Sequence, residues 1–555
     1  MKGRLLLVLA ILLWVGTSHG QYVHQAAIDS LFTDWDHIES PGCAIGVVQN
    51  GELVYARGYG SADLEHDVPL GPHSVFYMAS VSKQFVTFCI LLLEEEGKID
   101  LDAPIQTYLP DFPEYDAPLT TRHFIHHTSG VRDYLTLMGL KGLDYMDDSD
   151  PEEVYELIKR QSELNFPPGE RYLYSNSCYF MLAMIVERVT GQSIKEYAEE
   201  HVFGPLGMQR THFHDDNTHL IKHRAFSYEP REDGGYRNLI MRFDQVGSGG
   251  LYSCVEDMFL WDQNFYDNKL GKGGPEIMEL MHTEGMLNNG ERIEYAFGVS
   301  NGEYRGLRTV SHGGALAGYR TYLLRFPDQH TSIIFLGNRA DADSGGNSYR
   351  IADIVLKDQL AAETEEMTAE EAVVTSTAYI PESLEPYAGA YSVQPGVDFT
   401  AEIDGDTLRV IQHWNDVSYA ILPKDEHVFV IPQSDVAFRF SDLQNNQAQM
   451  VIVKQGDSET ECRRKLDFEL RAADMPQYVG SYYSRDLDCN YEIYLENETL
   501  MIRKPRQSPV ELIFNDADTF GDGRSAYTVW RNGNAIAGFR LDAGRVTNLK
   551  FVRVK

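Results

Sequence analysis

The stretch that decides the fold is residues 79–96, which read ASVSKQFVTFCILLLEEE. From Phe85 to Leu93 nearly every position is apolar, which predicts a helix buried on all sides. Ser80 and Lys83 stand just before this run, and a helical spacing of three places both side chains on one face. A buried lysine loses its charge readily enough to take a proton from serine and make it a nucleophile. The alternative, a solvated helix start, fits poorly because Lys83 leads straight into the apolar run.

A second candidate element is Tyr174-Ser175-Asn176, which follows Pro167-Pro168-Gly169 and precedes an apolar helix that begins at Tyr179. A tyrosine can relay a proton, and an asparagine can hold a substrate carbonyl. The same spacing occurs at Tyr266-Asp267-Asn268, within a polar stretch typical of a solvated loop. We therefore favour Tyr174 because of its flanking residues.

The third element is His312-Gly313-Gly314-Ala315, followed by Gly318. Glycines allow a substrate backbone to come close to the edge of a strand. A backbone amide at this edge, together with the amide of Ser80, would form an oxyanion hole. The alternative is a tight turn that carries a surface histidine.

In this order, the three elements resemble the serine β-lactamase and penicillin-binding protein superfamily, specifically its class C-like branch. Further matches are His127-Thr128-Ser129-Gly130, Pro205-Leu206-Gly207-Met208 and Gly249-Gly250-Leu251-Tyr252-Ser253, the last followed by Asp257. The resemblance covers about residues 25–340. It implies an α+β protein with the β-lactamase/DD-peptidase-like fold, in which an antiparallel sheet is flanked by helices and joined by a helical subdomain.

The resemblance also implies a role for each residue. Ser80 would be the acylated nucleophile, and Lys83 and Tyr174 would share the general-base and general-acid roles. Asn176 would orient the substrate, while Ser80 and Ala315 would supply the oxyanion amides. The expected substrate-binding residues are therefore Asn176, His312, Gly314 and Ala315.

His312 is a departure, because most lactamases have the lysine of K-T-G there, and histidine is mostly neutral at pH 7. This favours the D-amino-acid peptidases and esterases of the branch over a true β-lactamase. The leading expectation is a serine hydrolase that acts on peptides or amides with D-amino acids, or on peptidoglycan-derived peptides. A carboxylesterase and then a β-lactamase are the enzyme alternatives. A catalytically idle binding protein with the same fold is the non-enzyme alternative.

The predicted hydrolase domain is residues 21–362. Residues 44–55 predict a β-hairpin with a tight turn at Asn50-Gly51. Residues 322–326 and 332–336 predict two strands around a Pro-Asp turn, and Asp150-Pro151 predicts the start of a helix.

Beyond this domain, acidic and small residues at 363–380 predict a linker. The chain then shows short alternating strands and a weak repeat, with Tyr387-Ala388-Gly389-Ala390-Tyr391 similar to Tyr478-Val479-Gly480-Ser481-Tyr482. We predict two small all-β antiparallel barrels, at 381–470 and 471–555. They resemble the lipocalin-like barrels of some related hydrolases, notably a D-aminopeptidase, where such a barrel can restrict the catalytic cleft. A single larger β-domain is the alternative.

Residues 1–20 predict a signal peptide, with Lys2 and Arg4 before the apolar run Leu5–Val15 and small residues near Gly20. The alternative is an uncleaved N-terminal anchor. Such a signal peptide would direct the protein outside the cell or to the periplasm, and its cleavage would leave Gln21 as the first residue. No later stretch is apolar enough to cross a membrane.

Composition narrows the function further. The 555 residues include 48 Lys and Arg against 83 Asp and Glu, for a formal charge of −35. Such a surface disfavours nucleic acid and anionic lipid as partners and leaves a small-molecule or peptide substrate; the oligomeric state stays open. The sequence has no P-loop and no dinucleotide fingerprint, and its six cysteines lack zinc-ligand spacing, so we expect no metal and no cofactor. If any cysteines pair, Cys462 and Cys489 are the favoured pair.

Overall fold

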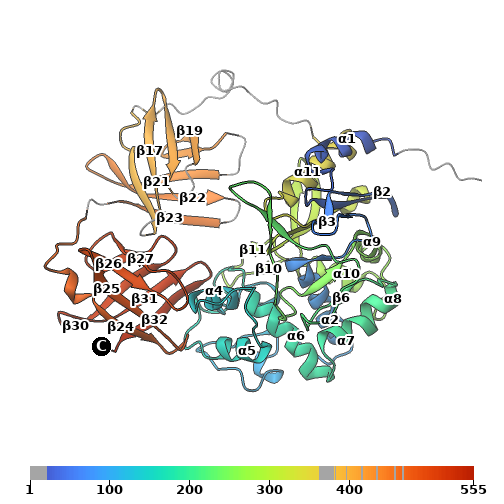
Figure 1. The fold of residues 1–555 in the computed structure, drawn as a ribbon, viewed down its shortest axis with the longest axis horizontal. Coiled ribbons are helices and arrows are strands. Elements are labelled where there is room, and N and C mark those ends of the chain that lie inside the picture. The colour runs from blue at the N-terminus through green and yellow to red at the C-terminus, as the bar shows by residue number, and fades with distance from the viewer. Residues whose placement is uncertain are drawn as a thin grey trace, which may run out of the picture.

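The computed structural model describes residues 22–361, 381, 383–394, 397–413, 417–432, 436–455, 458–465 and 468–554. Figure 1 shows an N-terminal domain (22–361) of mixed helices and strands beside two all-β parts, the barrel domain (383–465) and the C-terminal domain (468–554). The predicted signal peptide and the predicted linker at 363–380 lie outside the described residues.

The N-terminal domain is built on a six-stranded antiparallel sheet with the order β12-β13-β14-β15-β1-β2. The strands are Ser300–Tyr304, Leu307–Leu316, Tyr319–Phe326, Thr331–Gly337, Cys43–Gln49 and Glu52–Tyr59 in that order. The predicted hairpin is confirmed, since Asn50 (φ 51°) and Gly51 (φ 81°) have the positive φ values that a two-residue I′ turn requires. The predicted strands at 322–326 and 332–336 are confirmed within β14 and β15.

Helices cover both faces of this sheet. On one face, α1 (Gln25–Leu31) and α11 (Ser344–Val355) pack over Ile45 and Val47 of β1. On the other, α9 (Val255–Asn264) packs against β1 and β15 beneath Ala44 and Val48. Side chains alternate in direction along a strand, so β1 contributes to both cores.

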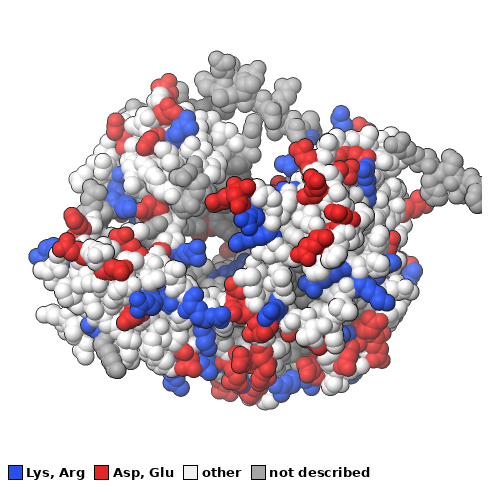
Figure 2. Space-filling view, in the orientation of Figure 1, with Lys and Arg blue, Asp and Glu red and all other residues white. Residues whose placement is uncertain are grey.

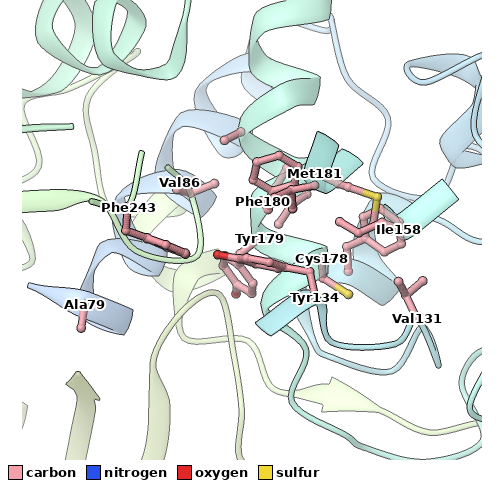
Figure 3. Close-up of a cluster of buried hydrophobic side chains, with 14 of the residues drawn as sticks. Ala79, Val86, Val131, Tyr134, Ile158, Cys178, Tyr179, Phe180, Met181 and Phe243 are labelled. Atoms are coloured by element: carbon pink, nitrogen blue, oxygen red, sulfur yellow. The ribbon is translucent and has the colours of Figure 1, made fainter. Parts of the chain in front are cut away.

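The predicted buried helix is α2 (Lys83–Glu95), and all its residues from Lys83 to Leu93 are buried. It packs against α6 (Asn176–Thr190) in a helical subdomain that also holds α3 (Thr121–Ile125), α4 (Tyr134–Leu140) and α5 (Pro151–Lys159). The predicted start of α5 is confirmed, because Asp150 Oδ1 accepts a hydrogen bond from the Glu152 amide at 2.8 Å. Figure 3 shows Tyr134 and Phe180 of this core together with Phe243.

The remaining elements of the N-terminal domain are short. The helices are α7 (Ile194–Ala198), α8 (Gly204–Leu206) and α10 (Glu276–Met281). The short strands are β3 (Ser61–Asp63), β4 (Val68–Pro69), β5 (Phe76–Tyr77), β6 (His212–Phe213), β7 (Tyr228–Pro230), β8 (Tyr236–Asn238), β9 (Leu251–Ser253), β10 (Gly285–Met286) and β11 (Arg292–Ile293).

The barrel domain closes eight antiparallel strands, β16 to β23, in sequence order. Its interior is filled by aromatic side chains, among them Tyr391, Phe399 and Phe440, so it is a packed core. The strands are Gly389–Gln394, Val397–Asp404, Thr407–Gln412, Val417–Asp425, Val428–Val430, Val436–Gln444, Gln447–Gln455 and Ser458–Arg464.

The C-terminal domain is a nine-stranded sheet with the order β27-β26-β25-β24-β32-β31-β30-β29-β28. Its two end strands, β27 (Val510–Glu511) and β28 (Ile513–Phe514), are separated by Leu512 alone, so the sheet curls until its edges meet and is barrel-like. The other strands are β24 (Gly480–Ser484), β25 (Cys489–Glu496), β26 (Thr499–Arg503), β29 (Thr519–Gly521), β30 (Ala526–Asn532), β31 (Ala535–Ala543) and β32 (Val546–Arg553).

The sequence repeat corresponds to a repeated structural feature. Tyr391 Oη donates to the Tyr387 carbonyl at 2.9 Å, and Tyr482 Oη donates to the Tyr478 carbonyl at 2.6 Å. In each domain the ring of the second tyrosine also faces an arginine near the end of the last strand, Arg464 or Arg553. The prediction of two all-β units rather than one is therefore confirmed.

The favoured cysteine pair does not form. All six cysteines are free: Cys462 lies in the core of the barrel domain and Cys489 begins β25 of the next domain, so each is held by packing in a separate unit. Among the described residues, no helix is long and apolar enough to cross a membrane. Figure 2 shows Asp and Glu over all three parts of this face, with Lys and Arg interspersed.

Candidate active site

Ser80 lies at a strained turn that leads into the buried helix. The short 3-10 turn Ala79–Ser82 runs directly into α2, and Ala79 has a φ of 47°, which is unfavourable for a residue with a side chain. The turn is held by two bonds to Met78, whose carbonyl accepts from Thr321 Oγ1 at 2.9 Å and whose amide donates to the Leu251 carbonyl at 2.8 Å. These bonds hold the strained turn in place and with it Ser80, which lines a cleft.

The side chain of Lys83 meets Ser80 as the spacing predicts. Its Nζ lies 3.1 Å from Ser80 Oγ, 2.9 Å from Asn176 Oδ1 and 2.6 Å from the Ser248 carbonyl. Burial of the whole side chain holds the pKa of Lys83 well below its usual value of 10.5, and the charge of Arg545 adds to this effect while that of Asp133 opposes it. A neutral amine has two N–H groups for the two carbonyl oxygens and keeps its lone pair for the Ser80 proton.

Asn176 is held between Lys83 and a buried aspartate. Its Oδ1 accepts from Lys83, and its Nδ2 donates to Asp133 Oδ2 at 2.9 Å. The same carboxylate oxygen accepts from the backbone amide of Asn176, the first residue of α6, at 2.7 Å. The other oxygen, Oδ1, accepts from the Thr136 amide at 3.0 Å and caps α4. Asp133 thereby fixes the first turns of α4 and α6 and the side chain of Asn176.

Tyr174 lies beside Ser80 and Lys83 with its hydroxyl inside the protein. The Lys83 Nζ is 4.8 Å from the centre of its ring, and its hydroxyl has no well-formed hydrogen bond among the described residues. Burial raises the pKa of Tyr174 above its usual 10, although the neighbouring Ser80 hydroxyl opposes that shift. Tyr174 therefore carries its proton at neutral pH.

His312 is part of β13, not of a turn, so the turn alternative is wrong. Its Nδ1 lies 2.6 Å from the Gly313 carbonyl, and its Nε2 lies 3.0 Å from Tyr295 Oη. A neutral imidazole that donates from Nδ1 and accepts at Nε2 satisfies both contacts. Burial lowers the pKa of His312 to about 4, so the ring is uncharged at neutral pH.

Among the described residues, no strand pairs with the edge of β13 near Ser80. Strand β12 pairs only with Leu307–Ser311, which leaves 312–316 paired on one side, with β14. We predicted that glycine at position 314 lets a substrate backbone come close, but the structure gives a different reason for this residue. A Cβ there would lie 2.3 Å from the Met78 carbonyl oxygen and 2.4 Å from Thr321 Oγ1, so Gly314 lets β13 pack against the turn that carries the serine.

A cleft of about 490 Å³ brings the predicted residues together. Ser80, Tyr174, Asn176, His312, Gly314 and Ala315 all line it. Lys83 lies directly behind Ser80. Tyr266, the rejected match, lies in a different pocket beside His330.

The cleft also contains residues that sequence reasoning missed. Ser248 holds Lys83 from a loop, and its hydroxyl lies 2.8 Å from that of Tyr134. The only signal for Asp133 was its place before an apolar helix, and no motif marked Arg545. Yet Arg545, from the C-terminal domain, lines the cleft, with its guanidinium carbon 4.7 Å from the centre of the Tyr174 ring and Nη1 4.0 Å from Asp133 Oδ2.

The C-terminal domain reaches the cleft because it docks on the N-terminal domain, next to α4 (Figure 1). The buried Arg132 is the centre of this contact. Its Nη1 bonds to Asp486 Oδ2 and to Gln161 Oε1, both at 3.0 Å, and its Nη2 bonds to the carbonyls of Thr547 and Asn548. Because this contact holds the C-terminal domain against the cleft, Arg545 is part of the site.

Comparison with known proteins shows the family of the chain. The family model described as Beta-lactamase matches residues 29–356, which is more than half of the chain. The chain therefore belongs to the beta-lactamase family and is a serine hydrolase of that family. The two all-β domains lie outside the matched range.

Individual relatives extend the comparison. Penicillin-binding protein 4* of Bacillus subtilis is 27% identical over 436 residues, which cover 75% of this chain and 94% of that protein. A D-aminopeptidase of Gluconobacter oxydans is 28% identical, over 54% of this chain and 56% of its own length. Another D-aminopeptidase, from Brucella canis, is 30% identical, over 55% of this chain and 58% of its length. The chain thus spans little more than half of these two aminopeptidases.

Solved structures share the fold. A penicillin-binding protein homologue from Pyrococcus abyssi, described as octameric, aligns with a TM-score of 0.55 and 20% identity over 87% of this chain and 98% of that one. A D-amino acid amidase from Ochrobactrum anthropi aligns with a TM-score of 0.51 and 20% identity over 60% of this chain and 98% of its own. The predicted α+β fold is therefore confirmed.

Proposed function

We propose that this hydrolase cleaves amide bonds of D-amino-acid or peptidoglycan-derived peptides through an acyl-enzyme on Ser80. The observation that carries the proposal is the placement of Lys83 Nζ, 3.1 Å from Ser80 Oγ and bonded otherwise to two carbonyl oxygens. A buried neutral amine in that position is a general base for the serine. The names of the relatives, D-aminopeptidase and penicillin-binding protein, support the choice of D-configured substrates.

The reaction has two balanced halves. Ser80 Oγ attacks the carbonyl carbon while its proton passes to Lys83, and the amides of Ser80 and Ala315 stabilise the oxyanion. The C–N bond then breaks, the leaving amine takes a proton from Tyr174, and Lys83 returns a proton to Tyr174. Water attacks the ester carbonyl and loses a proton to Lys83. The C–O bond to Ser80 then breaks and Lys83 gives that proton to Ser80 Oγ, which releases a carboxylic acid and free Ser80.

The contacts divide the labour between the polar residues. Tyr174 acts as the acid, because it carries its proton at neutral pH and its hydroxyl makes no well-formed hydrogen bond among the described residues, so the proton is available to the leaving group. Asn176 acts first as a positioning residue, since its oxygen holds Lys83 and its nitrogen is bonded to Asp133. The free edge of β13 at 312–316 offers the substrate backbone a strand to pair with.

The substrate class can be tested with four chromogenic compounds: N-acetyl-D-alanine p-nitroanilide, its L enantiomer, p-nitrophenyl butyrate and a cephalosporin. We expect the D-anilide to be cleaved about 10²-fold faster than the L-anilide, because the wrong enantiomer misplaces the carbonyl against Ser80. Ser80→Ala should abolish cleavage, whereas Ser30→Ala, which changes an exposed hydroxyl on α1, should not. Hydrolysis of the ester alone would mean that the protein is an esterase and not an amidase. Activity that survives Ser80→Ala would show that Ser80 is not the nucleophile.

We also propose that residues 1–20 direct the chain out of the cytoplasm, to the periplasm or the exterior, and are then removed. The support is the basic start and the apolar run of the sequence. N-terminal sequencing of protein recovered from its native compartment should begin at Gln21. A mature chain that still begins at Met1 would favour the uncleaved anchor.

A further inference from the structure

The charge of the cleft is opposite to that of the whole protein. The chain carries a formal charge of −35, yet no Asp or Glu is found among the described residues that line the cleft. Its charged side chains are Arg320 and Arg545, and its histidine, His312, is neutral. A cleft lined by two guanidinium groups attracts an anion and disfavours an ammonium group.

Arg545 is held at the cleft by its backbone, which leaves its side chain available. It lies in the turn between β31 and β32, and its carbonyl accepts from Asn165 Nδ2 at 3.0 Å and from the Asp133 amide at 3.4 Å. The side chain is 43% exposed, and Asp133 Oδ2, which lies 4.0 Å from its Nη1, already accepts two hydrogen bonds from Asn176. The guanidinium therefore keeps hydrogen-bonding capacity for a ligand.

Arg320 comes from the N-terminal domain, on β14, where it pairs with Ala315 of β13. Its Nη1 donates to the carbonyls of Ala317 and Tyr319, at 3.0 and 2.8 Å. The nearby Asp341 is engaged in two bonds with Arg339, both at 2.7 Å. Carbonyl oxygens thus orient Arg320 without neutralising its charge.

We propose that Arg320 and Arg545 form an anion-binding subsite, so that the preferred substrates carry a carboxylate next to the bond that is cleaved. The inference rests on the proposed function and deepens it: it assigns peptides with a free carboxylate, and it disfavours substrates that present a free amino group. Arginine binds a carboxylate with charge-assisted, often bidentate hydrogen bonds. Because His312 is uncharged, the charge for this recognition comes from a second domain and from β14.

The first test measures recognition without assuming which amide is cleaved. Hydrolysis of p-nitrophenyl butyrate is inhibited with N-acetyl-D-alanine, with N-acetyl-D-alaninamide and with D-alaninamide, which are anionic, neutral and cationic at pH 7. We expect the anion to have an inhibition constant at least about tenfold lower than the neutral compound, as charge-assisted bonds predict, and the cation to bind most weakly.

Variants test whether the two arginines cause the preference for the anionic inhibitor. Arg545→Gln and Arg320→Gln should each reduce the preference for the anion about tenfold, because each keeps a polar side chain and removes one charge. Arg540→Gln is the matched control, since Arg540 lies on β31 and pairs with Glu163 at 3.2 Å, away from the cleft. Equal inhibition by the acid and the amide, or an equal loss in Arg540→Gln, would overturn the inference.

The source of the carboxylate is resolved with two pairs of substrates. N-acetyl-D-Ala-D-Ala against its C-terminal amide tests an α-carboxylate, and D-Glu against D-Gln p-nitroanilide, both N-acetylated, tests a side-chain carboxylate. Preference for the acid in either pair, lost in Arg545→Gln, supports the inference and names the source. If no amide is cleaved but the anion still inhibits best, the proposed function fails and the subsite stands. If both members of each pair are cleaved equally, the subsite fails and the function stands.

Discussion

Lys83→Met is expected to lower kcat/KM about 10³-fold, the size of effect that removal of a general base produces. Methionine matches the length of the lysine stem and fills the buried space next to α6, so the change removes chiefly the amine. Ser80 would then keep its proton, because the other described groups bonded to Lys83 Nζ are carbonyl oxygens, which are no base for it. The rate on the D-anilide or the ester measures the loss.

The assignment of Lys83 as the base also predicts the direction in which kcat/KM changes with pH. The active form is the neutral amine, so kcat/KM of the wild type should rise with pH and level off above the pKa of Lys83. Burial holds that pKa well below 10.5, which puts the rise at lower pH than for an exposed lysine. Lys83→Met should lose this rise.

Lys98→Met is the control, because Lys98 is an exposed lysine paired with Glu96. It should leave both the rate and the profile unchanged. If Lys83→Met kept more than about a tenth of the activity while Ser80→Ala had none, Lys83 would not be the base.

The parts of the structure that depend on local sequence were predictable. Asn50-Gly51 encodes its hairpin because both residues tolerate positive φ, and the apolar run after Lys83 encodes a buried helix. Three residues of helical spacing bring Lys83 to Ser80 without help from the rest of the chain. The repeated tyrosines, four residues apart, likewise make their hydrogen bond within one short segment.

What sequence reasoning missed depends on contacts between distant segments. Arg545 follows Tyr174 by several hundred residues and reaches it only because two domains dock. Asp133 caps α4 within its own segment, whereas its second role, accepting from the backbone amide of Asn176, depends on α6 beginning beside it. No periodicity or spacing carries such information, since it lies in the packing of one domain on another.

The docking contact itself provides the second large prediction: Arg132→Met should destabilise the protein by about 3–5 kcal/mol, the cost of leaving one partner of a buried ion pair alone. The side chains of Arg132 and Asp486 are 1% and 5% exposed and lie 3.0 Å apart. Without Arg132, the Asp486 carboxylate would stay buried, with the Ser162 hydroxyl as its only side-chain donor among the described residues. Chemical denaturation, followed by probes in each domain, measures the loss.

The double variant Arg132→Met/Asp486→Leu separates this charge effect from lost packing. It removes both charges, so it should recover most of the stability lost in the single variant, as replacement of buried ion pairs by apolar residues often does. Arg540→Gln, at an exposed pair of the same interface, should cost no more than about 1 kcal/mol. If single and double variants were equally unstable, the pair would not hold the domains together. If Arg132→Met frees the C-terminal domain, Arg545 leaves the cleft, and the preference for anionic inhibitors should fall as in Arg545→Gln while Ser80 still hydrolyses the ester.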